Sequence, residues 1–307
     1  MAGSPSGWRC TRIPTSRSAA RGRSTPGRSS PPTSRSKIAE TAPDVCWVDG
    51  RLQPLAAPAL RADDSAYTEG RGCYTSARVE AGRVWFEDRH VNRLVRTARQ
   101  LGIGELDDGT VRGAFSELAE AAFGAGPGVI RFQASRDTAG TVHLVGVPRP
   151  VGAEADTWSA IVADLRHAGA AGETGFKVTS RLAIALAADA ARNAGADEAL
   201  LLDAAGHLVE GTRSNIVVVP PGAGPATPGR QSGAVAGIAL EAAREHVPEV
   251  AECPLSQTDL QGAGEILALN AVRGVRPITR LDGNPVGDGR PGPWAERFAA
   301  ALAEDCS

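Results

Sequence analysis

Runs of strand-forming residues, broken by single helices, fill the chain from residue 158 onward, and their order restricts the possible folds. Residues 158–162, 199–202, 215–219, 265–269 and 274–281 are rich in branched apolar side chains, as in buried strands. Apolar residues recur at helical spacing between only some of these runs. A doubly wound parallel sheet needs regular alternation of strands and helices, so the pattern disfavours that fold.

The helices predicted in this part of the chain are few. They span residues 182–194, 235–245 and 294–303. Since strands outnumber helices, we predict a strand-rich domain over residues 153–307.

The preceding segment predicts a smaller domain. Asp49 and Gly50 form a turn signal between two short apolar runs, and a second hairpin is expected around residues 80–82. The remaining predicted elements are helices 87–101 and 108–123, the latter capped by Asp107 or Asp108, and strands 128–134 and 141–147. We therefore predict a small α/β domain over residues 44–152, and for the whole chain a two-domain α/β fold of the α+β type.

The N-terminal segment has a different composition. Residues 1–43 contain eight basic residues and a single acid, Glu40, among Ser, Thr, Pro and Gly, with no periodic apolar face. Such a segment buries too little apolar surface to offset the entropy of ordering it, so we predict a disordered tail. It is compatible with an organellar transit peptide, an extension from an early start codon or a weak nucleic-acid arm. We favour a dispensable tail.

Composition limits the remaining function classes. The net charge is -2 with 22% charged residues, so no global field favours nucleic acid or membrane, and no apolar run approaches the roughly 20 residues of a membrane-spanning helix. The cysteines are odd in number and lack Cys-x-x-Cys spacing: Cys10, Cys46, Cys73, Cys253 and Cys306. We expect reduced thiols, no metal site and a cytoplasmic location.

Lys177 and Glu210 are the first candidate site residues. Lys177 lies in an apolar Gly-Phe-Lys-Val setting just before the helix predicted at 182–194. Glu210 follows 33 residues later, in a predicted turn between two β-rich runs, and Ser214 and Asn215 come shortly after it. Burial and nearby cations lower the pKa of a lysine amine enough to make it a nucleophile.

These residues belong to a set of motifs that resembles the class IV (fold type IV) pyridoxal-phosphate enzymes, which include branched-chain aminotransferases, D-amino acid aminotransferases and aminodeoxychorismate lyases. Five short motifs occur in the family's order over about residues 45–303. They are centred on His90-Val91-Asn92-Arg93-Leu94, Lys177, Glu210, Gly233 to Ala239 and Asn270-Ala271.

The resemblance implies pyridoxal 5'-phosphate as the cofactor and assigns its contacts. Lys177 carries it as a Schiff base and transfers protons at the substrate, Glu210 faces the pyridine nitrogen, and Arg93 pairs with the phosphate. The remaining implied cofactor contacts are Ser214, Asn215, Ile238, Ala239, Asn270 and Ala271. Ala239 and Ala271 lack a hydroxyl, and Leu240 replaces the family's usual Arg, so the phosphate is expected to depend on Arg93 and on backbone N–H groups.

The substrate residues are inferred from one stretch. Residues 72–79, Gly-Cys-Tyr-Thr-Ser-Ala-Arg-Val, resemble aminodeoxychorismate lyases more than branched-chain aminotransferases. Thr75 is a candidate substrate contact, and Arg78 is a candidate carboxylate partner, although a structural salt bridge explains it equally well. Arg71 replaces the family's usual acid, and either favours a dianionic substrate or faces water.

Three functions remain open. The first is a lyase that converts 4-amino-4-deoxychorismate to 4-aminobenzoate and pyruvate, for folate biosynthesis or a specialised metabolite. The second is a class IV amino-acid aminotransferase of the branched-chain or D-amino acid type, although no Arg-x-His pair follows Arg136. The third is a non-catalytic relative. The resemblance also implies a homodimer that acts on a small molecule and binds no nucleic acid or membrane.

Overall fold

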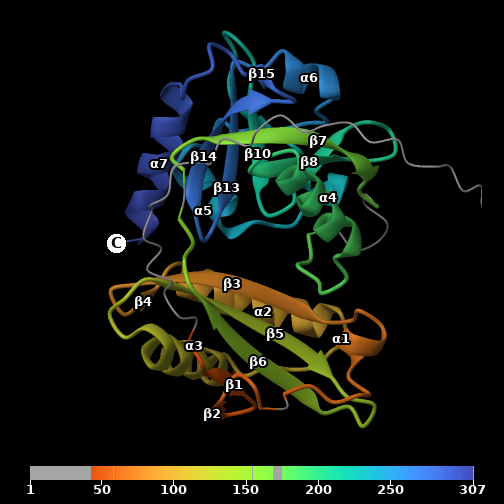
Figure 1. Cartoon of the computed structure of the whole chain (residues 1–307), viewed down its shortest axis with the longest axis vertical. Coiled ribbons are helices and arrows are strands. Elements are labelled where there is room, and N and C mark those ends of the chain that lie inside the picture. The colour runs from red at the N-terminus through yellow and green to blue at the C-terminus, as the bar shows by residue number, and fades with distance from the viewer. Residues whose placement is uncertain (1–42, 58, 154, 169–174, 307) are drawn as a thin grey trace, which may run out of the picture. The chain divides into compact units, whose positions relative to one another are not determined.

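The computed structural model describes residues 43–57, 59–153, 155–168 and 175–306. Except for residue 43, the predicted tail lies outside these residues. The described residues form two mixed layers of sheet and helix (Figure 1), which agrees with the predicted α/β fold. The first sheet ends at Arg149 and the second begins at Trp158. The predicted boundary between residues 152 and 153 falls between them and stays a prediction.

The first sheet has six strands, all paired antiparallel, in the order β2-β1-β6-β5-β3-β4. Their bounds are Cys46–Val48 (β1), Arg51–Gln53 (β2), Cys73–Glu80 (β3), Arg83–Val84 (β4), Gly128–Arg136 (β5) and Val142–Arg149 (β6). Its helices are α1 (Ser65–Thr68), α2 (Glu87–Gln100) and α3 (Asp108–Phe123).

Strand alternation decides which side chains of β3 and β5 face the helices. Cys73, Ala77 and Val79 of β3 belong to the core that α2 and α3 cover, together with Ile130 and Phe132 of β5. Because successive side chains point to opposite faces of a strand, the residues between them point away from this core. The opposite face of the sheet is therefore available to a site.

The second sheet has nine strands, in the order β12-β11-β10-β13-β14-β7-β8-β9, with β15 paired to β14. Their bounds are Trp158–Arg166 (β7), Glu198–Leu202 (β8), Leu208–Gly211 (β9), Asn215–Val219 (β10), Ala226–Thr227 (β11), Ala251–Glu252 (β12), Glu265–Asn270 (β13), Gly274–Leu281 (β14) and Asn284–Pro285 (β15). The pairs β14/β7, β7/β8 and β11/β12 are parallel and the others are antiparallel.

This sheet is covered on both faces, which explains its continuous apolar runs. In β10, Val217 and Val219 join one hydrophobic cluster, while Ile216 and Val218 join another on the opposite face. Its helices are α4 (Leu182–Asn193), α5 (Ile238–His246), α6 (Gln257–Gln261) and α7 (Pro293–Cys306), with the 3-10 turn η1 at Arg230–Ser232.

Two sequence predictions need correction. Glu210 was expected in a turn, but it lies within strand β9, and the chain turns after it, before β10. The helix predicted from residue 235 begins at Ile238, because Gly237 is extended and forms its N-cap. Both corrections affect the site. Glu210 is held in a strand, and the residues before Ile238 form an extended turn in place of a helix.

Candidate active site

Lys177 is held in place by backbone pairing with β3. The Tyr74 N–H donates to the Lys177 carbonyl at 2.9 Å, the Thr179 N–H donates to the Gly72 carbonyl at 2.9 Å, and Cys73 forms an antiparallel bridge with Val178. The segment that carries the lysine is thereby fixed against the first sheet. Its ammonium lies 5.1 Å from the centre of the Tyr74 ring.

The surroundings of Lys177 favour a neutral amine. Burial and the nearby Arg93 and Arg181 guanidinium groups lower the pKa of Lys177 to about 7, although the Glu210 carboxylate opposes the shift. A lysine with this pKa is partly unprotonated near neutral pH, so it can act as a nucleophile and as a base.

Glu210 lines the same cavity as Lys177. One carboxylate oxygen accepts a hydrogen bond from the Val235 N–H at 3.0 Å, and the other lies 3.9 Å from Nε2 of His167. Burial raises the pKa of Glu210, while the charge of Lys177 opposes the increase. Such a buried carboxylate is suited to hold a protonated ring nitrogen.

Arg93 and the start of α5 form an anion-binding corner. The Arg93 guanidinium donates from Nη2 to the Thr75 hydroxyl at 2.7 Å and from Nη1 to the Ala236 carbonyl at 3.4 Å. Its Nε is buried, with no hydrogen-bond partner among the described residues. Helix α5 begins without a side-chain cap, and Ile238 lines the cavity. Unpaired donors of this kind suit a phosphate group.

Four other predicted cofactor residues also line this cavity: Ser214, Asn215, Asn270 and Ala271. Asn270 donates to the Ser214 hydroxyl at 3.2 Å, and Asn215 donates to the Val235 carbonyl at 2.8 Å. Ala239 differs, because it packs in the hydrophobic cluster around α5 and is not part of the cavity wall.

Glu198 supports this wall, although it belongs to none of the sequence motifs. Its buried carboxylate accepts hydrogen bonds from the Ser214 hydroxyl at 3.0 Å and from the Thr212 N–H at 2.9 Å. It therefore fixes the turn between β9 and β10. The run Glu-Ala-Leu-Leu-Leu offered a signal, since a charged residue at the start of a buried strand requires partners.

The three predicted substrate contacts lie outside the cavity wall. Thr75 faces α2 and is fully buried. The guanidinium of Arg78 lies 4.7 Å from the centre of the Trp85 ring. It donates to Glu80 at 3.0 Å and to the Val272 carbonyl at 3.3 Å, as the alternative of a structural salt bridge predicts. Arg71 is exposed and pairs with Glu69 at 3.2 Å. Their substrate roles stay predictions that this placement does not favour.

Other residues occupy the wall in their place. Around the Tyr74 ring, the guanidinium carbon of Arg131 lies at 3.8 Å and that of Arg181 at 5.2 Å. Arg181 also donates to the Tyr74 hydroxyl and, at 2.8 Å, to the Thr212 carbonyl. Strand alternation was the available signal, because Tyr74 and Arg131 fall between core-facing residues of β3 and β5.

The cavity has a volume of about 610 Å³ and a strong excess of positive charge. Among its lining residues, Glu210 is the only carboxylate, against Lys177 and six arginines: Arg93, Arg131, Arg149, Arg181, Arg213 and Arg273. This balance contrasts with the chain's net charge of -2 and favours ligands with several negative charges.

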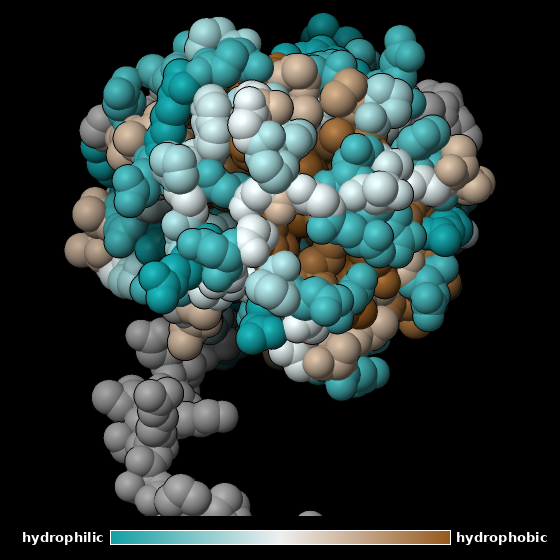
Figure 2. All heavy atoms as spheres, turned by 90° about the horizontal axis from the view of Figure 1, so that it is seen from above, coloured by the Kyte–Doolittle hydropathy of each residue, from teal (hydrophilic) through white to brown (hydrophobic). Residues whose placement is uncertain are grey.

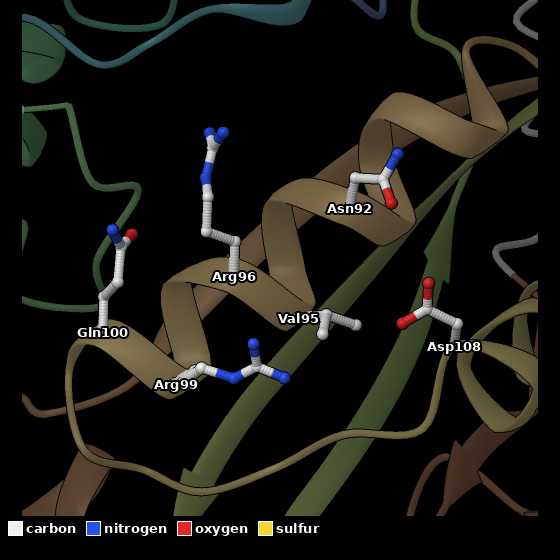
Figure 3. A pocket seen from close by; sticks show the side chains of 6 residues that line it. All are labelled: Asn92, Val95, Arg96, Arg99, Gln100 and Asp108. Atoms are coloured by element: carbon white, nitrogen blue, oxygen red, sulfur yellow. The ribbon is translucent and has the colours of Figure 1, made fainter.

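A second depression lies on the outer face of α2, and Figure 3 shows its side chains. Arg96 and Arg99 extend from the helix beside Asn92 and Gln100, with Asp108 of α3 across from Val95. Arg99 is paired with Glu105 at 2.6 Å. This open surface lacks the buried donors and acceptors of the first cavity.

The described residues offer neither a metal cluster nor a membrane-spanning helix. The described residues contain no group of three His, Cys, Asp or Glu side chains that is placed to hold a metal ion. None of the helices they form is long and apolar enough to cross a bilayer.

Comparisons with known proteins agree with this arrangement. Residues 72–281 match the family described as amino-transferase class IV. A D-alanine aminotransferase of Bacillus licheniformis is 25% identical over 83% of this chain and 94% of its own length. A bifunctional aminodeoxychorismate lyase / D-amino acid transaminase of Mycobacterium tuberculosis is 29% identical over 58% of this chain and 67% of its own.

Solved structures share the fold. The branched-chain amino acid aminotransferase of Escherichia coli superimposes with a TM-score of 0.77 at 23% identity, over 86% of this chain and 95% of that one. A PLP-bound hypothetical aminotransferase from Mycobacterium tuberculosis gives 0.74 at 22% identity, over 85% and 98%. The fold is therefore fold type IV, and the family match over most of the length shows that this chain is an enzyme of the amino-transferase class IV family.

Proposed function

We propose that this enzyme uses pyridoxal 5'-phosphate to convert 4-amino-4-deoxychorismate to 4-aminobenzoate and pyruvate. The observation that carries the proposal is a single cationic cavity in which Lys177, Glu210 and Arg93 meet. Family membership supports the cofactor, and the set of cations supports a substrate with two carboxylates. The presence of all three residues gives no support to the non-catalytic alternative.

The residues of the cavity fit this cofactor. The unpaired Nε of Arg93 and the uncapped start of α5 would hold its phosphate, and Glu210 would hold a proton on its ring nitrogen. Lys177 would bind its carbonyl carbon, because the lowered pKa makes its amine nucleophilic. When bound, the cofactor supplies an electron sink for the pair released as a substrate bond breaks.

The chain's own residues then bind the substrate and move protons. Arg131 and Arg181, beside Tyr74, are placed to hold carboxylates. Lys177, once the substrate amine has replaced it, takes the proton from the ring carbon that bears the amino group. The bond between the ring and the enol-ether oxygen breaks, the ring becomes aromatic, and Lys177 returns a proton to the departing pyruvate enol. Together, 4-aminobenzoate and pyruvate contain all the atoms of the substrate, so the reaction consumes no other reactant.

A class IV aminotransferase is the second candidate. It is favoured by the D-alanine aminotransferase relative, which matches over most of both chains. An aminotransferase requires a keto-acid acceptor and leaves its cofactor in the amine form between half-reactions. These two requirements separate it from a lyase, which needs no acceptor.

The decisive experiment is product analysis. Purified protein with added pyridoxal 5'-phosphate is supplied with enzymatically generated 4-amino-4-deoxychorismate, and 4-aminobenzoate and pyruvate are measured, with Lys177→Ala as control. Equal release of both products, lost in the variant, supports the lyase. If neither product forms and amino acids convert the cofactor to its amine form, the enzyme is an aminotransferase.

We also propose that the enzyme is a homodimer. Two leucines one helical turn apart on α4 are exposed, Leu182 by 75% and Leu186 by 47%. Figure 2 shows hydrophobic surface between polar residues on the face seen from above. Exposed apolar surface of this kind is a frequent feature of subunit contacts.

A further inference from the structure

The cavity corner that contains Arg93 includes a buried polar relay with no assigned role. The Thr75 hydroxyl oxygen lies 2.7 Å from Nη2 of Arg93 and 2.5 Å from Nδ1 of His90. His90 and Arg93 are three residues apart, so they share the face of α2 that packs on β3. Thr75 and His90 are fully buried, and Arg93 is 7% exposed.

The direction of the hydrogen bonds follows from the donors. A guanidinium only donates, so the Thr75 oxygen accepts from Arg93 and its single hydrogen is free to point at Nδ1 of His90. That arrangement requires the histidine tautomer protonated at Nε2. The other tautomer would leave both the Thr75 hydrogen and the Nε2 lone pair unpaired in the interior, which is less favourable.

The relay leaves a defined part of Arg93 free. Its Nη2 is fixed by Thr75 and its Nη1 points to the Ala236 carbonyl in the turn before α5, whereas its buried Nε has no partner among the described residues. Nε2 of His90 likewise has none there. Keeping an imidazole with an unpaired buried nitrogen costs free energy, so packing alone does not explain its presence.

We propose that His90 and Thr75 are positioning residues that fix the Arg93 guanidinium for the phosphate of the cofactor, with Thr75 acting away from the substrate. The inference rests on the proposed cofactor. It assigns the β3 threonine to the phosphate end of the site, where the sequence had suggested a substrate contact. The loss of Thr75 should therefore affect ligands with a phosphate and spare ligands without one.

The test uses two matched pairs of variants. Thr75→Val removes the hydroxyl at nearly constant shape, while Thr75→Ser keeps it. His90→Leu removes the acceptor, while His90→Asn keeps an acceptor near the position of Nδ1. Each protein is prepared without cofactor, checked for folding by circular dichroism and thermal unfolding, and titrated with pyridoxal 5'-phosphate, with pyridoxal and with inorganic phosphate.

The relay predicts phosphate-selective losses. Thr75→Val and His90→Leu should weaken pyridoxal 5'-phosphate and inorganic phosphate by about tenfold or more, as expected for a hydrogen bond that orients a charged group. Pyridoxal affinity should change less than about twofold, and Thr75→Ser and His90→Asn should recover most of the loss. Nitrogen chemical shifts of a folded sample should show His90 protonated at Nε2.

Two results would overturn the relay. One is equal weakening of pyridoxal and of its phosphate, and the other is unchanged phosphate affinity in Thr75→Val. Failure of the unmodified enzyme to bind pyridoxal 5'-phosphate would instead contradict the proposed cofactor. In that case the titration with inorganic phosphate still decides the relay.

Discussion

At the scale of single residues, Lys177 and Glu210 are linked by opposing effects of burial. Burial lowers the pKa of the amine and raises the pKa of the carboxyl, and the attraction between the two charges opposes both shifts. Neighbouring Arg93 and Arg181 strengthen the effect on the lysine. The amine is therefore kept reactive by burial and by the fixed cations around it.

This environment predicts a pH-dependent stability of the cofactor-free enzyme. The folded pKa of Lys177 is about 7 and the ordinary value is 10.5. Between them the unfolded chain binds one more proton, so the free energy of unfolding should rise with pH, by at most about 1.4 kcal/mol per pH unit. Denaturant unfolding from about pH 7 to 10 should show this rise, and Lys177→Met should remove it. The explanation is wrong if the free energy of unfolding rises equally with pH in the unmodified enzyme and in Lys177→Met. Glu210→Gln measures the contribution of the Glu210 carboxyl group, which has the opposite sign.

Arg131 supports a second residue-scale prediction. Replacing it with alanine removes a guanidinium beside the Tyr74 ring, so KM for 4-amino-4-deoxychorismate should rise about tenfold or more. Pyridoxal 5'-phosphate affinity should remain within about threefold. Arg99→Ala, on the outer face of α2, is the matched control and should change neither. An unchanged KM in Arg131→Ala would place the substrate carboxylates elsewhere.

At the scale of elements, most longer helices and strands were predictable because their apolar spacing is local. Helix α3 and strand β10 match the predicted ranges at both ends. The short elements are not evident in the local pattern, because they are two to five residues long and depend on tertiary contacts: α1, β9, β11, β12, β15 and α6. The approach of Tyr74, Arg131 and Arg181 also depends on strand register, which local patterns do not determine.

Gly237, the N-cap of α5, lies in close contact with the first residue of β10. A Cβ atom there would lie 1.6 Å from Oδ1 of Asn215, so Gly237→Ala must move the Asn215 side-chain amide and disturb its hydrogen bond to the Val235 carbonyl. We expect destabilisation of about 1–3 kcal/mol and weaker binding of pyridoxal 5'-phosphate. Gly113→Ala, in an exposed part of α3 with open space, should instead stabilise by up to about 1 kcal/mol. Thermal unfolding and cofactor titration measure both, and tolerance of Gly237→Ala would contradict the close packing.

At the scale of the whole molecule, the site draws on elements of both sheets. Lys177 pairs with β3 of the first sheet, whereas Glu210 belongs to β9 of the second. The motifs identified Lys177, Glu210 and Arg93 as a group. Glu198 was not identified, and His90 was named only as part of the Arg93 motif, because their roles come from contacts between segments that are separated in sequence.

The proposed dimer predicts a response to charge on α4. Leu182→Glu and Leu186→Glu together should shift the enzyme toward monomer, because they place carboxylates on an exposed apolar face. Light scattering coupled to size-exclusion chromatography measures the mass, and Leu52→Glu, at a 43% exposed position in β2, serves as control. A monomeric unmodified enzyme would refute the proposal, and an intact dimer in the double variant would locate the contact elsewhere.

Phe86 is the N-cap residue of α2 and has a left-handed backbone conformation, with φ of 54°. Its side chain is 8% exposed. It belongs to the hydrophobic cluster of Val217, Ile238 and Leu267, which are residues of the second sheet and α5. The residue that precedes α2, beside the first sheet, thus completes a hydrophobic cluster of the second sheet. We therefore expect residues of the two sheets to unfold together, because a fragment starting at residue 153 would have a cavity in place of the phenyl ring.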